Sequence, residues 1–246
     1  MAATGLRGKG LLLVGTVHRD PDGAGKLRRL LEKVRPAAVT VELSPYGLWY
    51  RQRYGRRQAR IVQARAKKLA EALGKCWRAW GQIQAMLVQI EVPFEYEAAE
   101  KYGHDYGAII QCVDSSEWSR RLISSQWPQL FSSRNIEALL GEEPEDMPSK
   151  VRQEYHLAGK LLNGQGGPLS YFYSRGCQAD STWQEREARM AAAVELVFRQ
   201  LNSGCLLHVG GWEHLLHPTA ADTLYERLLH LEPRRVLLST GEELPA

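Results

Sequence analysis

The chain has 246 residues, of which 44% are hydrophobic and 24% charged, a mixture typical of a globular protein with a full hydrophobic core. Its net charge of +4 and isoelectric point near 8.9 are only mildly basic, so composition does not require a polyanionic partner. We find no export signal, no apolar run long enough to span a bilayer and no paired cysteine spacing, and therefore expect a cytoplasmic protein without membrane contact.

The first predicted strand is the apolar run 11–14, which leads into a Gly-x-x-His motif that ends at His18. Four consecutive aliphatic residues are typical of a strand that helices cover on both faces. His18 then lies at the carboxyl end of the strand, where ligands usually bind in open α/β sheets. A histidine there is more often structural than catalytic. However, a second apolar strand at 205–210 is followed by the same motif, which ends at His214.

A turn and a helix over 25–34 separate the first strand from a second one at 38–42, which is rich in β-branched residues. A right-handed crossover would make the two strands parallel and would place Glu42 beside the loop that carries His18. A carboxylate at the end of an apolar strand needs compensation for its charge. Either a salt bridge to an arginine or a metal-binding or catalytic role would provide it.

From Ser44-Pro45, a good helix start, a helical pattern runs to about residue 91 and is broken by glycines into two or three helices. The segment is rich in cations, which indicates a solvated basic face or a surface for an anionic ligand. We do not expect nucleic acid, because no recognised binding module accompanies it. Trp49 and Arg51 in its first turns could hold a substrate carboxylate, or the aromatic residues could only pack the helix onto the sheet.

The rest of the chain adds two strands and several helices. We expect a helix at 93–102, a strand at 108–113, two helices within 128–162, a long helix at 181–202, a helix at 219–231 and a closing strand at 235–239. The strand at 108–113 ends at Asp114, which is most simply the N-cap of the next helix. Arg120 and Arg121 follow it, and the long helix carries Glu185 and Arg186.

Five short motifs occur in one order along the chain. They are Gly-Thr-Val-His ending at His18, Val-Glu-Leu around Glu42, the strand-end Asp114 with downstream arginine, Glu-Arg-x-x-x-Met-Ala from Glu185, and Val-Gly-Gly-Trp-Glu-His ending at His214. In this order the chain resembles the TraB/Tiki group, which shares a fold with erythromycin esterases and haem-binding ChaN-like proteins. The resemblance covers the whole chain.

The resemblance implies a single α/β domain over 1–246, with a mixed or mainly parallel central sheet flanked by helices. A large helical excursion at about 45–203 would cover the site, and substrate would reach the site beneath it. The group often has an arginine where this chain has Ser115, so the arginine of the site is left open. We expect Asp114, Arg120, Arg121, Glu185, Arg186 and Arg51 to contact substrate or to orient the residues that do.

The same resemblance implies a metal-dependent hydrolase, most simply a peptidase, with His18, Glu42 and His214 as catalytic residues and metal ligands. Two imidazoles and a carboxylate leave positions for water on zinc, manganese or cobalt, and such an ion makes water a nucleophile near neutral pH. Erythromycin esterases suggest an alternative in which a histidine is the general base without metal. Another alternative is a protein of this fold that sequesters haem or a peptide without turnover. A small molecule could replace the peptide as substrate.

Overall fold

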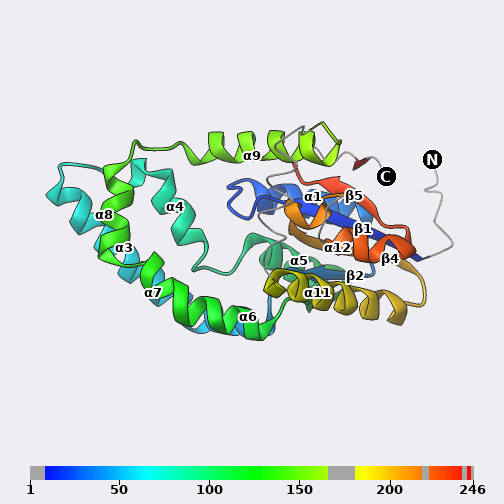
Figure 1. Cartoon of the computed structure of the whole chain (residues 1–246). Helices are drawn as coiled ribbons and strands as arrows, with labels where there is room; N and C mark the ends of the chain where they lie inside the picture. The colour runs from blue at the N-terminus through cyan, green and yellow to red at the C-terminus, as the bar shows by residue number, and fades with distance from the viewer. Residues whose placement is uncertain (1–8, 166–180, 218–221, 240–242, 245–246) are drawn as a thin grey trace. The chain divides into compact units, whose positions relative to one another are not determined.

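The computed structural model describes residues 9–165, 181–217, 222–239 and 243–244 (Figure 1). The chain forms two compact units. Unit one contains the described parts of 1–43, 94–115 and 154–246, and unit two contains 44–93 and 116–153. Each unit is described separately below.

Unit one is built on a six-stranded sheet with the order β3-β2-β4-β1-β5-β6. The strands are β1 (Lys9–Thr16), β2 (Ala38–Val41), β3 (Ile109–Cys112), β4 (Gly204–Gly211), β5 (Arg234–Leu237) and β6 (Glu243–Leu244). The first five are parallel, and β6 pairs antiparallel with β5 at the edge. This arrangement confirms the predicted α/β class with a mainly parallel sheet.

The two strands with Gly-x-x-His motifs lie side by side at the centre of the sheet. β1 and β4 are paired along their whole length, from Lys9 opposite Gly204 to Thr16 opposite Gly211. Apolar residues from Leu11 to Val14 are buried on both faces, as the continuous apolar run predicts. The register brings the carboxyl ends of both strands to the same height, so the residues that follow them emerge together.

Helices flank this sheet (Figure 1). They are α1 (Gly23–Val34), α5 (Phe94–Tyr106), α11 (Ser181–Gln200) and α12 (Leu224–Leu228), with the last part of α9 (Met147–Leu162). α5 extends four residues beyond the predicted end, and α12 is shorter than the predicted helix at 219–231, of which 218–221 lie outside the described residues. α11 packs beside β4, and its buried side carries Met190, Ala191 and Val194.

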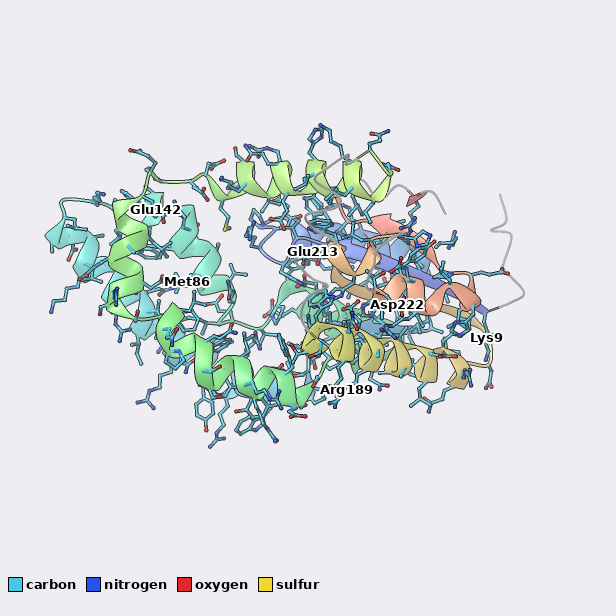
Figure 2. All side chains as sticks on the ribbon, in the orientation of Figure 1. Lys9, Met86, Glu142, Arg189, Glu213 and Asp222 are labelled. Atoms are coloured by element: carbon cyan, nitrogen blue, oxygen red, sulfur yellow. The ribbon has the colours of Figure 1, made fainter. Side chains whose placement is uncertain are left out.

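Unit two is helical and has its own core. Its elements are α2 (Pro45–Tyr50), η1 (Arg51–Gly55), α3 (Arg56–Ala72), η2 (Trp77–Ala79), α4 (Gly81–Val88), α6 (Ser116–Arg121), η3 (Leu122–Gln126), α7 (Trp127–Leu130), α8 (Ser133–Gly141) and the first part of α9. The predicted breaks occur near the glycines, and Gly74 takes a left-handed conformation (φ 66°) just after α3. Met86 of α4, labelled in Figure 2, is part of the buried cluster that joins α3, α4 and α8.

Among the described residues, no helix is both long and apolar enough to cross a membrane.

Candidate functional site

Three polar residues meet at the carboxyl ends of the central strands of unit one. His18 follows β1, Glu42 follows β2, and His214 lies in the short turn η4 (Trp212–Leu215) after β4. The Oε1 atom of Glu42 lies 2.9 Å from Nε2 of His214, and its Oε2 atom lies 3.7 Å from Nε2 of His18. The structure therefore brings together the three residues that the motifs singled out, with the carboxylate between the two imidazoles.

A second carboxylate contacts His18 at its other ring nitrogen, Nδ1. Glu95 of α5 is 2% exposed, and its Oε1 atom lies 2.8 Å from Nδ1 of His18 and accepts a hydrogen bond of 2.8 Å from the hydroxyl of Thr16. With Nδ1 directed at Glu95, Nε2 is the nitrogen that His18 presents to Glu42. Partial burial lowers the pKa of His18, but the charges of Glu95 and Glu42 outweigh it and raise the pKa to about 9.

His214 has the same arrangement in a more buried position. Oε1 of Glu187 on α11 lies 2.5 Å from Nδ1 of His214, while Oε2 accepts a 2.6 Å hydrogen bond from the backbone N–H of Leu224. The ring of Trp183 stacks on the imidazole, with centroids 5.0 Å apart and planes 7° from parallel. Burial lowers the pKa of His214, but Glu187 and Glu42 together raise it to about 10.

Arg186 is the arginine of this site. Its guanidinium donates two 2.9 Å hydrogen bonds to Asp114 and one of 2.5 Å to Oε1 of Glu42. The backbone N–H of Gly211 donates a 2.6 Å bond to Oε2 of the same glutamate. Burial raises the pKa of Glu42, but His214 and Arg186 lower it well below its usual value, so the carboxylate stays charged.

The two glycines at the end of β4 leave room for these side chains. A Cβ atom on Gly210 would lie 2.7 Å from Oε2 of Glu42, and one on Gly211 would lie 3.1 Å from Nε2 of His18. Both distances are too short for ordinary contact, and the first involves an oxygen that is already held by a hydrogen bond. Glycine is therefore needed at the first position because the carboxylate approaches the backbone closely.

The loop that carries His18 is fixed by the last part of α9. The backbone N–H of Val17 donates a 3.2 Å hydrogen bond to the hydroxyl of Tyr155. Arg19 pairs with Glu154, which also accepts a 3.3 Å hydrogen bond from the indole of Trp212. These contacts join the loops after β1 and β4, so both Gly-x-x-His motifs are positioned by one helix.

A third histidine lies beneath the site. His208 of β4 is fully buried, and its Nδ1 atom lies 3.0 Å from the hydroxyl of Thr40 on β2. Burial lowers the pKa of His208 to about 4, so this imidazole is neutral. Its neutrality distinguishes it from His18 and His214, each of which has a carboxylate at Nδ1.

The site has nearly balanced formal charge when both outer histidines are protonated. Four carboxylates, Glu42, Glu95, Asp114 and Glu187, face the cations Arg186, His18 and His214. Two imidazolium protons supply the same charge as one divalent cation. In the described part of the chain, no group of three or more His, Cys, Asp or Glu side chains is spaced to hold a metal ion. Both oxygens of Glu42 instead accept hydrogen bonds, from Arg186 and from the N–H of Gly211.

The remaining predicted site residues have other surroundings. Glu185 pairs with Arg189 at 2.5 Å on the exposed side of α11, where Figure 2 labels Arg189. Arg51, Arg120 and Arg121 belong to unit two. There Arg51 donates to the carbonyls of Gly47 and Gln89, Arg120 lies over the ring of Tyr46, and Arg121 pairs with Glu117. Their contact with a substrate stays a prediction.

Asp114 differs from the simple N-cap that its position suggested. Its Oδ1 atom accepts a 2.7 Å hydrogen bond from the N–H of the adjacent Ser115, and both oxygens bind Arg186. The bidentate arginine contact is stronger than a neutral capping bond. Asp114 therefore belongs to the charge cluster as well as to the turn before α6.

Sequence reasoning missed Glu95 and Glu187, although both carry a readable signal. Glu95 begins a buried row with Ala98, Ala99 and Tyr102, and Glu187 begins one with Met190 and Ala191. A carboxylate on the apolar side of a helix has to be compensated, and this is the signal that marks both positions.

Comparison of the chain with protein-family models, with curated proteins and with solved structures finds no match.

Proposed function

We propose that the protein is a hydrolase that activates water between His18 and Glu42, with a divalent metal held by His18, Glu42 and His214. The observation that carries the proposal is the pair of carboxylate-backed imidazoles, which both present Nε2 to one glutamate. Metal-binding histidines are commonly oriented in this way by a carboxylate on the other ring nitrogen. A peptide substrate is supported by the TraB/Tiki resemblance.

The residues fit a divalent ion in chemistry and in charge. Two imidazole nitrogens and one carboxylate suit zinc, manganese or cobalt, and such an ion supplies Lewis-acid activation of water near neutral pH. The ion would replace the two imidazolium protons without changing the charge of the cluster. Binding should therefore release close to two protons at neutral pH, because the pKa values of His18 and His214 are about 9 and 10.

The protein groups have separate parts in the proposed reaction. Glu42 orients the imidazoles and is itself fixed by Arg186 and the N–H of Gly211. Glu213, labelled in Figure 2, lies in the same turn as His214, and burial raises the pKa of its carboxyl group. A raised pKa favours the protonated form, which makes a carboxyl group better suited to donate a proton to a leaving group.

Calorimetric titration with Zn²⁺, Mn²⁺ and Co²⁺ in two buffers of different ionisation enthalpy measures affinity and proton release together. We expect stoichiometric binding with release of about two protons near neutral pH, and loss of binding in His18→Asn and His214→Asn. His104→Asn is the matched control, because this histidine of unit one is 89% exposed and pairs only with its neighbour Asp105 among the described residues.

Hydrolysis is assayed with internally quenched peptides and with aryl esters, before and after removal of metal by a chelator. Turnover that depends on added metal and disappears in Glu42→Gln supports the proposal. Metal binding without proton release would contradict the assignment of the two imidazoles as ligands. Binding of all three ions without turnover of any substrate would leave a metal-binding protein and refute the hydrolase.

A metal-free hydrolase is the second candidate, and the hydrogen bonds to both oxygens of Glu42 favour it. In that mechanism Nε2 of His18 is the general base, and Glu95 orients the imidazole. The side chain of His18 is 54% exposed and is therefore open to water. Because the pKa of His18 is about 9, the base form and the rate should increase as pH rises toward that value. Activity that resists chelators and follows this pH profile would identify the second mechanism.

The non-catalytic alternative is a protein that sequesters haem or a peptide. A Soret band on addition of haem would reveal haem binding. The proposal places the reaction in the cytoplasm. The thiols of Cys76, Cys112 and Cys205 are free, in keeping with a reducing compartment.

A further inference from the structure

Unit two carries an aromatic hollow on its surface, formed by α2, η1 and α3. The rings of Tyr46, Trp49, Tyr50 and Tyr54 surround it, with neighbouring centroids 5.1 to 6.5 Å apart. Its volume of about 480 Å³ lies in the range of ligand pockets. Ile61 on the same wall is 49% exposed, as is Trp49. Large apolar side chains gathered in this way around a hollow indicate a binding surface.

The edge of the hollow is positively charged. Arg57 lines it directly, and the segment from Ser44 to Ala70 contains eight arginines and lysines and no aspartate or glutamate. Four cations of this segment are exposed and have no carboxylate partner among the described residues: Arg56, Arg57, Arg60 and Lys68. Other cations of the segment bind the protein itself; Arg65, for example, donates to the carbonyl of Phe131. A ligand for this surface should therefore be anionic.

A side chain with hydrogen-bonding groups also lines the hollow. Nε2 of Gln58, whose side chain lines the hollow, donates a 2.7 Å hydrogen bond to the hydroxyl of Tyr50. Its Oε1 atom is buried and has no hydrogen-bond partner within the described part of the chain. An unpartnered amide oxygen is costly, and a rotation of the Gln58 side chain that turns this oxygen toward the hollow would let it accept from an N–H donor, such as the backbone of a peptide.

We propose that this hollow binds an acidic peptide segment of a partner protein, which inserts an aromatic or branched aliphatic side chain between the rings. Arg57 and the neighbouring cations would pair with its carboxylates, and Gln58 would accept from its backbone. The hollow suits an inserted side chain better than stacked bases, because the rings pack on one another and Arg120 covers a face of Tyr46. A concave surface also suits a side chain better than a flat membrane. This inference does not depend on the proposed hydrolase.

The test begins with selection of displayed random peptides of about a dozen residues on the full chain, with the Arg57→Glu variant as counter-selection. We expect enrichment of Asp and Glu around an aromatic or aliphatic position. A fluorescein-labelled peptide that repeats Glu-Glu-Phe-Leu, and the best selected peptide, are then titrated by anisotropy. Affinity should fall about tenfold or more in Arg57→Glu and in Tyr54→Ser.

Lys33→Glu is the matched control, since this exposed lysine of α1 in unit one changes the net charge by the same amount. Circular dichroism verifies that every variant is folded. Two control peptides test the two parts of the proposal. A repeat of Glu-Glu-Ser-Ser lacks the apolar side chain, and a repeat of Lys-Lys-Phe-Leu has the opposite charge. Neither should bind. The proposal is overturned by selection without acidic enrichment, by equal loss in Lys33→Glu, or by equal binding of Glu-Glu-Ser-Ser. Tighter binding of a single-stranded oligonucleotide or of phosphatidylserine vesicles at the same residues overturns it too.

Discussion

Replacing Arg186 by methionine should strongly destabilise unit one, because the variant leaves Asp114 without its cation and removes one of the cations that face Glu42. Arg186, Glu42 and Asp114 are only 12%, 6% and 7% exposed, so water cannot solvate the charges that remain. Methionine has a similar length and fills the same space beside Trp183, whose ring the guanidinium faces at 5.5 Å. The loss is therefore one of charge rather than of volume.

The expected size follows from this burial. Removing one partner of a buried ion pair typically costs about 3–5 kcal/mol, which is roughly a hundredfold to several-thousandfold increase in the equilibrium constant for opening. The control is Arg189→Met on the same helix. Arg189 and its partner Glu185 are 51% and 61% exposed, so we expect a cost of at most about 0.5 kcal/mol.

The assay is hydrogen exchange measured on peptides from β1 and β4, because it reports on the stability of unit one by itself. A single melting curve of a chain with two units would combine the stabilities of both. The pKa of Glu42 is lowered in the folded state, so its stabilising effect is present above the unfolded value of about 4.5 and is lost as pH falls through the folded value. Without Arg186 this lowering is weaker. The difference between the variant and the parent should therefore be largest near neutral pH and shrink in acid.

Equal protection of β1 and β4 in Arg186→Met and Arg189→Met would refute this reasoning. So would a difference that grows below pH 4.5.

Three further predictions concern the groups around Glu42. In metal-free protein, the pKa of His18, followed by nitrogen-edited NMR of labelled imidazoles, should fall from about 9 toward 6.5 or below in Glu95→Gln; an unchanged value would remove Glu95 as its cause. The pKa of His214 is raised from 6.5 to about 10, so its stabilisation is complete below pH 6.5 and lost as pH rises through 10. The protection factors of β4 amides, which correct for the pH dependence of exchange in the unfolded chain, should therefore fall over that range, and constant protection factors would contradict the assignment. Gly210→Ala should cost about 1–3 kcal/mol and abolish any hydrolysis, whereas Gly10→Ala, where nothing lies within 4 Å, should cost much less. Hydrogen exchange of peptides from β1 and β4 compares the two variants, and equal losses of protection would disprove the steric argument.

The three central residues of the site could be read from the sequence because each ends an apolar strand. Continuous aliphatic runs define buried parallel strands, and their carboxyl ends meet at one edge of the sheet. His18, Glu42 and His214 therefore follow from local pattern and a general rule of topology. The parallel order of the strands follows in the same way from the crossover rule.

The partners of these residues were decided by tertiary packing. Glu95 and Glu187 follow His18 by 77 and 169 residues in the sequence, and no motif spacing connects them to it. Their position on the apolar side of a helix marks them as unusual, but which histidine each one meets depends on where the helix packs against the sheet. The same packing selects Arg186 from several arginines, because its guanidinium reaches both Glu42 and Asp114.

The division into two units was also a result of packing. From the sequence, the helices after Ser44 are predicted to cover the site. In the structure they form a separate hydrophobic core together with α8. Hydrophobic periodicity shows that a helix buries one face, but it does not show which other face it meets. Local patterns depend on a few neighbouring residues and can be read one segment at a time. Contacts between distant segments depend on the shape and charge of both surfaces, which exist only once the chain has folded.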